Sequence, residues 1–499
     1  MARPSRPFRR WDNKQSFTLP LNTADWLPEG HLALFIDAVV ERLDLDAFYV
    51  RYDNEGRGCV PYDPRMMIRI ILYGYAVGVT SSRKLERRTI EDIAFRYLAG
   101  GNTPDHHTIS EFRRSNRAAV VGLFHQLLME ARKAGMARMG RVALDGTKVK
   151  ANASMDRTWS ADKLDKEGQK ILDDLERAFD EAERIDREED AIYGDEKEFL
   201  LPKGMRTRAE ILGRMDEARR QIGEDRQRQL DEDRKREEGA AEERKRKEEE
   251  EAKKGKKLRG RKPKEPGEKR VRLKEAKRNV TDPDSRLMNV KSGYIQGYNV
   301  QLAVDMDDQM IVAVAVTQDG NDKQQLNSML DRMEATVGLP EVTAADNGYC
   351  SRKEIEKASG RTDLFVSMCD DPGDLPPGWG EGEPPLCLSA EGVMSWKMAR
   401  PSGVAIYGQR CSSVEPVNGQ LKEQQGMRQF RLRGLKLVDL EAHLFAIGSN
   451  LKKMWHWPAE ALEKCPGTHG KGTEGGGRRS GSCLLDRKHR LSLGISGAI

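Results

Sequence analysis

Apolar residues recur every three or four positions between His31 and about Gly135, which is the period of amphipathic α-helices. The pattern is clearest in LALFIDAVVERL and in RMMIRIILYGYAV, and Asp63 and Pro64 precede the second stretch as a helix cap and a first helical residue. The shorter stretches TIEDIAFRYL and HHTISEFRRSNRAAVVGLFHQLLMEARKAG continue the pattern. The sequence therefore predicts an N-terminal all-α domain over residues 1–135.

The period changes to that of a β-strand at residues 140–150, where Val142 and Leu144 alternate with smaller or polar neighbours. Two further stretches of this kind are GYIQGYNVQLAVD (293–305) and MIVAVAVTQ (310–318). Because only the polar residues MDDQ separate them, they predict an antiparallel hairpin.

Helical and strand patterns alternate in the rest of the chain. KQQLNSMLDRMEATVG is predicted to be a helix, and EVTAAD and DLFVSM contain short strands. After a Pro/Gly loop at 371–385, one long helical pattern runs from Ser412 to about Trp455. This order predicts an α/β core with a mixed sheet flanked by helices. We place the core at residues 140–160 and 281–457.

A charged insertion, residues 161–280, separates the two parts of this core. From Ala161 to about Glu251, acidic and basic residues surround thinly spaced Leu and Ile, which is typical of long solvated helices or a helical hairpin. Residues 251–280 hold 14 Lys and Arg against 4 Glu, a net charge of +10, together with Pro and Gly. That composition argues against a packed fold. The Gly, Arg and Ser content of 458–499 predicts a disordered tail.

Composition sets further bounds. Charged residues make up 33% of the chain, but 86 basic and 81 acidic residues leave a net charge of only +5, so charge must be read segment by segment. The seven cysteines form no CxxC pair, so neither a disulfide framework nor a thiolate zinc site is indicated. No run approaches the roughly 18 apolar residues that a membrane span requires. We expect a soluble cytoplasmic protein with no membrane partner.

Three acidic residues stand where a site could form. Asp145 and Asp346 each end an apolar stretch, and sites collect at the carboxyl ends of strands in α/β sheets. Glu415 shares a helical stripe with Asn418 and Lys422. Converging acids repel one another unless cations lie between them, and oxygen ligands favour Mg²⁺ or Mn²⁺. Two such ions could assist phosphodiester displacement. Taken singly, a strand-terminal acid is more often a surface cap.

The context of these acids resembles a known family. The matching stretches are VALDGTKVKANAS, GYIQGYNVQLAVD, AADNGYCS, YGQRCSSVEPVNGQLKEQQGMRQFRLRGLKLVDLEAHLFAIGSNLKK and, near the N-terminus, PDHHTISEFRR. They occur in the family's order over most of the chain. The chain resembles the bacterial insertion-sequence transposases of the DDE type, which have an RNase H-like catalytic domain.

The resemblance implies the roles of several residues. Asp145, Asp346 and Glu415 would be the catalytic residues and the ligands of two Mg²⁺ or Mn²⁺ ions. Tyr407, Arg410, Glu415 and Lys422 would correspond to a Tyr-Arg-Glu-Lys signature that contacts DNA around the third acid. Four residues separate Arg410 from Glu415, one more than the best-known spacing.

Further DNA contacts are predicted from charge. Lys148 is expected to face phosphate, with simple solvation of the strand end as the alternative. In LRGRKPKEP, Arg259 and Arg261 resemble a minor-groove hook, although a solvated linker has the same composition. The helix HTISEFRRSNR is expected to enter a groove with Arg113, Arg114 and Arg117 exposed.

The resemblance implies a transposase that binds terminal inverted repeats, cleaves DNA with the help of metal ions, and joins the freed 3′-hydroxyl to target DNA. Its partners would be double-stranded DNA and further copies of itself, as a dimer or higher oligomer on DNA. It would be found in the bacterial cytoplasm, associated with the nucleoid. The charged insertion would grip DNA, pair protomers or serve as a spacer. Two alternatives are a catalytically inactive DNA-binding relic and an RNase H-like nuclease without strand transfer.

Overall fold

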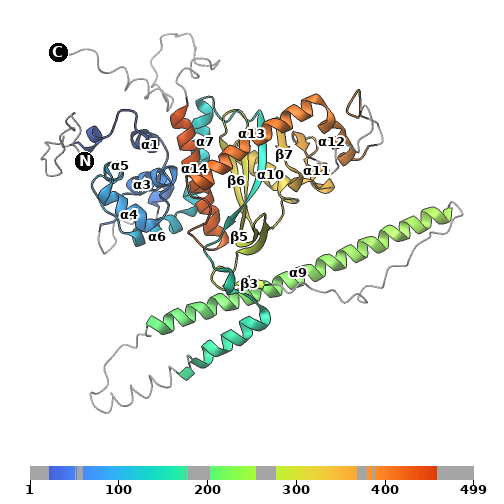
Figure 1. Cartoon of the computed structure of the whole chain (residues 1–499), viewed down its shortest axis with the longest axis horizontal. Coiled ribbons are helices and arrows are strands. Elements are labelled where there is room, and N and C mark those ends of the chain that lie inside the picture. The colour runs from blue at the N-terminus through green and yellow to red at the C-terminus, as the bar shows by residue number, and fades with distance from the viewer. Residues whose placement is uncertain are drawn as a thin grey trace, which may run out of the picture.

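A computed structural model describes residues 22–50, 52, 60–174, 176–177, 203–253, 277–367, 379–384 and 388–457. A mixed β-sheet lies at the centre, with helices around it, and the long helix α9 (Lys203–Lys253) extends away from this body (Figure 1). The predicted tail at 458–499 and most of the basic segment at 251–280 lie outside the described residues.

The N-terminal region is helical, as predicted. Its elements are the 3₁₀ helix η1 (Thr23–Trp26) and the helices α1 (Leu32–Val40), α2 (Asp46–Tyr49), α3 (Pro64–Ala76), α4 (Ser82–Glu91), α5 (Ile93–Leu98), α6 (His106–Ser115) and α7 (Arg117–Lys133). The predicted start of α3 is confirmed, because the Asp63 carboxylate accepts a hydrogen bond from the amide of Arg65 and Pro64 is the first helical residue.

Two stretches predicted as single helical segments are each divided by a polar residue. Asp92 has an extended backbone, and its carboxylate accepts hydrogen bonds from the amides of Ala94 and Phe95, so it ends α4 and caps α5. Asn116 lies between α6 and α7, and its side-chain amide donates to the carbonyl of Phe112. Such local hydrogen bonds compete with helix continuation, and the apolar period does not reveal them.

The central sheet has the strand order β4-β5-β1-β7-β8, with β6 also paired to β5. Its strands are β1 (Arg141–Lys150), β4 (Arg286–Val290), β5 (Gly293–Asp305), β6 (Ile311–Thr317), β7 (Val342–Ala345) and β8 (Asp363–Val366). β5 is antiparallel to β1, β4 and β6, whereas β1, β7 and β8 are parallel to one another. The predicted hairpin and the predicted mixed sheet are confirmed.

Helices from the second half of the chain pack on this sheet. They are α10 (Gln325–Thr336), α11 (Arg352–Ala358), α12 (Ala390–Ala399), α13 (Pro401–Glu423) and α14 (Leu435–His456). α13 packs across β1, β7 and β8, α14 packs against β6, and α10 packs against β5 and β6. Helices therefore flank the sheet, as predicted.

The single helical pattern predicted from Ser412 to Trp455 is wrong, because this segment forms two helices. Gly426 and Gly434 both have a φ of +81°, a left-handed conformation that is incompatible with a continuous α-helix. The chain between α13 and α14 is therefore not helical. The buried carboxylate of Glu441 in α14 accepts hydrogen bonds from backbone amides of this connection, which hold the turn in place.

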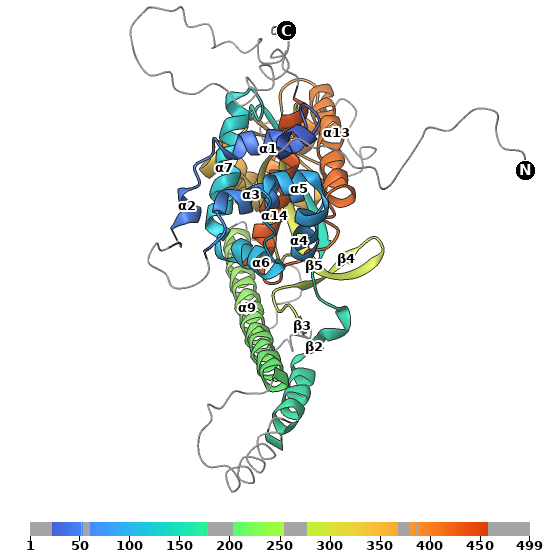
Figure 2. The ribbon, with the colours of Figure 1, turned by 90° about the vertical axis from the view of Figure 1, so that its left-hand side faces the viewer.

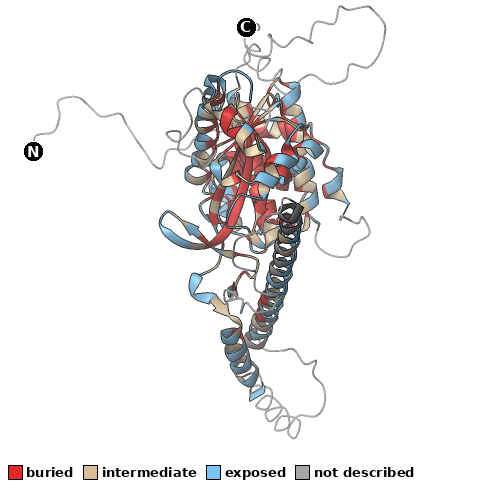
Figure 3. Cartoon of the chain, turned by 90° about the vertical axis from the view of Figure 1, so that its right-hand side faces the viewer, coloured by how far each residue is buried: buried red, intermediate tan, exposed pale blue. Residues whose placement is uncertain are grey.

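α14 joins the N-terminal helices to the sheet. It packs against α3 and α7 as well as β6, and nearly all of its residues from Val438 to Leu451 are buried. One hydrophobic core cluster extends from α1 through the sheet to α14, and Figure 3 shows the buried centre. The core is thus continuous across the predicted boundary at residue 135. Among the described residues, neither α14 nor any other helix is long and apolar enough to cross a bilayer.

The charged insertion forms an arm. At its base β2 (Thr158–Ser160) pairs antiparallel with β3 (Lys277–Asn279), and residues 161–174 are helical. A small core of its own joins this helical segment to α9: Leu164, Met215, Ala218, Ile222 and Val280. The arm is mostly exposed in Figure 3, which confirms the prediction of long solvated helices.

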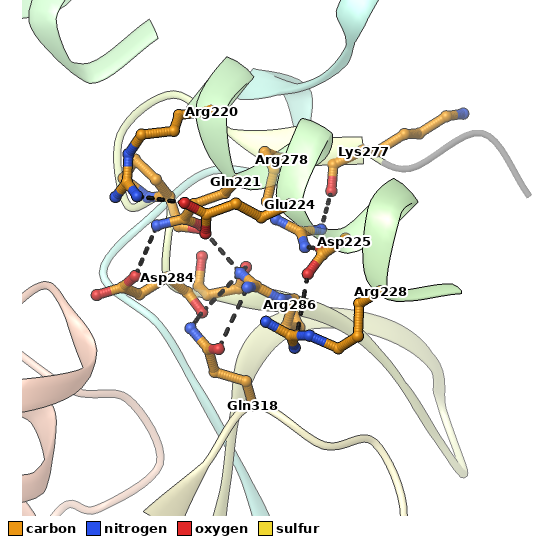
Figure 4. Close-up of polar contacts among 12 residues, drawn as sticks. Arg220, Gln221, Glu224, Asp225, Arg228, Lys277, Arg278, Asp284, Arg286 and Gln318 are labelled. Carbon is orange, nitrogen blue, oxygen red and sulfur yellow. Dashed lines mark hydrogen bonds and ion pairs between the residues drawn. The ribbon is translucent and has the colours of Figure 1, made fainter. Parts of the chain in front are cut away.

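A polar cluster attaches α9 to the body of the protein (Figure 4). The buried guanidinium of Arg278 forms an ion pair with Asp225 of α9. Gln221 of α9 donates to Oδ1 of Asp284 over 3.0 Å, and Oδ2 of Asp284 accepts from the amide of Leu435 over 2.9 Å. The arm is therefore tied to the segment before β4 and, through Asp284, to the first turn of α14.

A close approach of α14 to α3 gives a test of the packing. A Cβ at Gly448 would lie 2.8 Å from the backbone nitrogen of Ala76 and from the carbonyl carbon of Tyr75. Since backbone atoms cannot rotate away, Gly448→Ala should lower the free energy of unfolding by about 1–3 kcal/mol, measured by urea denaturation. The control is Gly122→Ala in α7, where the space is open, and it should raise stability by about 0.5–1 kcal/mol. Equal stability of the two variants would contradict the close packing.

Candidate active site

Asp145 and Asp346 lie next to each other at the same level of two parallel strands. Leu144 in β1 is the register partner of Ala345 in β7, so the following residues, Asp145 and Asp346, are brought together where β7 ends. Both side chains are partly buried. The two acids thus come together, but the prediction that Asp145 ends its strand is wrong, because β1 continues to Lys150 and stays paired with β5.

Burial disfavours the ionised form of both carboxylates. Burial, followed by the negative charge of Asp346, raises the pKa of Asp145 to about 6, while Arg410 opposes this shift. Burial also raises the pKa of Asp346, where the positive charge of Arg410 acts in the opposite direction. The acid pair therefore carries an electrostatic cost that a nearby cation would relieve.

α13 presents polar side chains to Asp145. Nδ2 of Asn418 donates to Oδ2 of Asp145 over 2.6 Å, and Nη1 of the buried Arg410 lies 3.6 Å from Oδ1. Lys422 is half-buried; burial lowers its pKa, and the charge of Asp145 acts against this. The neighbouring apolar stripe of the helix is buried, as expected: Val414, Val417 and Leu421.

Glu415 is exposed on α13. It lies on the stripe that contains Asn418 and Lys422, one turn before Asn418. Its carboxylate forms no hydrogen bond or ion pair with any described residue. Of the three acids predicted to converge, the structure brings Asp145 and Asp346 together and leaves Glu415 at the solvent side of the helix.

A further carboxylate near the pair, that of Asp322, was not expected from the sequence. Asp322 lies in the loop between β6 and α10, and its Oδ1 accepts hydrogen bonds from Asn299 (2.7 Å) and Gln301 (2.5 Å) of β5. Its negative charge contributes to the raised pKa values of Asp145 and Asp346. In the sequence, Asp322 is one of several polar residues in TQDGND, which follows a predicted strand. Many other acids of the chain lie in similar polar stretches, so this position does not identify it.

The amide of Gln301 also belongs to a buried polar layer. Its Oε1 accepts a hydrogen bond from the hydroxyl of Tyr349, which is fully buried and follows Asp346 by three residues. Burial raises the pKa of Tyr349 well above its ordinary value, so the phenol remains a donor. The loops that contain Asp322 and Asp346 are thus connected through one β5 side chain.

Two family models match the chain. One, described as "Transposase domain (DUF772)", matches residues 21–115, which include α1 to α6. The other, described as "Transposase DDE domain", matches residues 389–455, which include α12, α13 and nearly all of α14. No curated protein and no solved structure matches the chain significantly. The second match contains the helix whose side chains contact Asp145.

These two matches support an insertion-sequence transposase of the DDE type.

The acid pair of this transposase offers the donors that a hard divalent cation prefers. Asp145 and Asp346 provide only oxygen atoms, which suit Mg²⁺ or Mn²⁺. Their raised pKa values indicate the repulsion that such a cation would relieve. In the part of the chain that the structure describes, no three His, Cys, Asp or Glu side chains are grouped closely enough to hold a metal ion. In this arrangement the guanidinium of Arg410 supplies positive charge beside Asp145.

The predicted DNA contacts around the site of the transposase make internal contacts. The guanidinium of Arg410 lies over the ring of Tyr407, 5.2 Å from its centroid. Nζ of Lys148 donates to the carbonyl of Asn289 in β4 over 2.7 Å. The predicted minor-groove residues, Arg259 and Arg261, lie outside the described residues.

The expected exposure of Arg113 is wrong. Its side chain is 3% exposed, and Nη1 donates to the hydroxyl of Tyr75 (3.1 Å) and to the carbonyl of Thr80 (2.9 Å). Because Arg113 follows Ile109 by four residues, it shares the buried face of α6. Arg114 is exposed, as predicted.

Exposed basic residues that were not singled out from the sequence lie on the neighbouring helix α4. They are Arg83, Lys84, Arg87 and Arg88. α4 packs against α6, and Figures 1 and 2 both show the two helices at the end of the helical region nearer the arm. Arg87 and Arg88 pair with Glu91 and Asp92, and the exposed basic side chains of α4 and Arg114 lie on two helices that pack together.

Asp145→Asn should stabilise the metal-free transposase at neutral pH. Because the folded-state pKa of about 6 exceeds the ordinary 3.8, ionisation of Asp145 destabilises the fold as pH rises from 4 to 6. Asn removes this charge and can still accept from Asn418. At pH 7.5 in EDTA, we expect about 2 kcal/mol more free energy of unfolding than in the wild type, and little difference at pH 4. An equal gain at both pH values would contradict this explanation.

Arg113→Ala and Arg114→Ala should affect different properties. Loss of the buried Arg113 leaves the Thr80 carbonyl without this donor, so the free energy of unfolding should fall by about 2–4 kcal/mol. Arg114→Ala should change stability by less than about 0.5 kcal/mol, but it should weaken DNA binding in a fluorescence anisotropy titration. An Arg113→Ala variant with wild-type stability and weakened DNA binding would show that Arg113 contacts DNA and is not needed for folding.

Proposed function

We propose that this transposase binds the terminal inverted repeats of an insertion sequence, cleaves the DNA there, and joins the freed 3′-hydroxyl to target DNA. The observation that supports this most directly is the pair of partly buried carboxylates, Asp145 and Asp346, at neighbouring parallel strands. The match of 389–455 to a DDE transposase domain agrees with this chemistry. The mixed sheet flanked by helices supports an RNase H-like catalytic domain.

Two Mg²⁺ or Mn²⁺ ions are proposed as cofactors, with Asp145, Asp346 and Glu415 as their ligands. When bound, such ions stabilise negative charge on the attacking and leaving oxygens of a phosphodiester. Asp145 would hold them from within β1 and Asp346 from the end of β7, and Glu415 would join from α13 after a change of its rotamer or of the helix on DNA. Asn418 orients the Asp145 carboxylate, and Arg410 balances its charge before a cation binds.

DNA binding is proposed for several basic regions. Arg114 and the exposed basic residues of α4 would contact the element ends, and Lys148, Tyr407 and Lys422 would contact the strand near the acid pair. Arg259 and Arg261 belong to the segment with a net charge of +10, which suits sequence-independent phosphate contact. A dimer or higher oligomer would bring two ends together, with the arm as a grip on DNA or a contact between protomers.

A strand-transfer assay tests this function. The full chain is incubated with Mg²⁺, a duplex that contains the terminal sequence flanking its gene, and a target plasmid. We expect joined products with the wild type and none with Asp145→Asn or Asp346→Asn, because each variant loses one proposed cation ligand. Glu415→Gln should also lose activity, whereas Glu423→Gln, an exposed acid on the same helix that pairs with Arg428, should retain it.

The outcomes separate the alternatives. Cleavage without joined product would indicate a nuclease, and DNA binding without either product would indicate an inactive relic. Full activity of Glu415→Gln would remove Glu415 from the proposed ligands but would leave the role of Asp145 and Asp346 intact.

A further inference from the structure

The carboxylate of Asp322 is held in a fixed place beside the acid pair. Both of its anchoring donors, Asn299 and Gln301, come from the central strand β5 and are fully buried. Gln301 is in turn held by the hydroxyl of Tyr349. Since two amide donors converge on one oxygen, Oδ1, the side chain of Asp322 has little freedom to turn.

Two glycines next to the catalytic aspartates make room for this carboxylate. A Cβ at Gly146 would lie 2.7 Å from Cγ and 2.8 Å from Oδ2 of Asp322, and a Cβ at Gly348 would lie 3.2 Å from the same Oδ2. Gly146 directly follows Asp145, and Gly348 follows Asp346 by two residues. Asp322 is therefore seated against both segments that carry the acid pair.

Hydrogen bonding alone does not explain an acid at this position. Oδ1 accepts both anchoring hydrogen bonds, and an asparagine could present the same oxygen to the same donors. What only the aspartate adds is a negative charge, which acts on the carboxylates of both Asp145 and Asp346. The negative charge of Asp322 at this position therefore indicates a role in addition to packing.

We infer that Asp322 is a positioning residue of the acidic site: it fixes the spacing of the Asp145 and Asp346 segments and adds a negative charge that strengthens cation binding there. This inference rests on the proposed metal-dependent function. Asp322 would act in addition to Glu415. It lies in the β6–α10 loop, which is outside both regions matched by the family models.

Mg²⁺ binding by the full chain, measured by calorimetry, tests the charge. Asp322→Asn keeps the size of the side chain and an acceptor for Asn299 and Gln301, but it removes the charge, so we expect Mg²⁺ to bind about tenfold more weakly than to the wild type. The control is Asp319→Asn in the same loop. Asp319 is exposed and its carboxylate accepts from Gln325, so Mg²⁺ affinity should not change.

A second variant tests the spacing while the charge is kept. Gly146→Ala should displace the Asp322 carboxylate and weaken Mg²⁺ binding, whereas Gly140→Ala, just before the same strand, meets open space and should not. A purely structural role predicts lowered melting temperatures with unchanged Mg²⁺ affinity. If Asp322→Asn does not fold, the Mg²⁺ affinities of Gly146→Ala and Gly140→Ala are compared instead, and weaker binding by Gly146→Ala alone supports the role of Asp322.

The failure of this inference differs from the failure of the proposed function. Wild-type affinity for Mg²⁺ in both folded variants, Asp322→Asn and Gly146→Ala, would overturn the role of Asp322. If Mg²⁺ did not bind the wild type, or bound Asp145→Asn equally well, the proposed cation site itself would be wrong. Weakened binding in both Asp322→Asn and Gly146→Ala, with both controls unchanged, would support the inference.

Discussion

Repulsion between carboxylates that the sheet forces together is the constraint on which the site depends. The register of β1 and β7 brings the backbones of Asp145 and Asp346 side by side. Burial is the main cause of the raised pKa of Asp145, and the charge of Asp346 adds to it. In this structure the guanidinium of Arg410 and the amide of Asn418 partly compensate. The sheet thus holds a charge arrangement that is more stable with a cation than without one.

The position of α14 makes the N-terminal helices and the central sheet parts of one packed unit. α14 is buried between the N-terminal helices and β6, and the connection that precedes it is held by Glu441. The same connection runs beside the end of β1, where the amide of Phe430 donates to the carbonyl of Lys150. Displacement of the N-terminal helices by DNA would therefore be transmitted to the strand that carries Asp145. Separate domains joined by a linker would lack this mechanical connection.

Sequence patterns predicted the parts of the site that depend on one element at a time. Asp145 and Asp346 could be found because each follows a run of apolar residues, although β1 continues past Asp145 and only Asp346 follows the end of its strand. Asp322 could not be found in this way, since its role arises from two glycines and two amides on three other segments. Arg113 was misjudged because a basic residue within a buried helical face looks like any other basic residue until its acceptors are known. The break between α13 and α14 could not be read from the apolar period either, because it depends on the left-handed conformation of Gly426 and Gly434.

The short β2–β3 pair has a consequence for how this protein can vary. Because the two strands are hydrogen-bonded neighbours, the polypeptide leaves and re-enters the body at one point, whatever lies between. Closing a loop twice as long costs only about 0.6 kcal/mol more. α9 is nevertheless bound to the body, because the buried Arg278 pairs with Asp225 and Gln221 donates to Asp284. A tight turn in place of the arm would therefore leave the guanidinium of Arg278 without its carboxylate partner, so length can vary beyond these contacts but not through them.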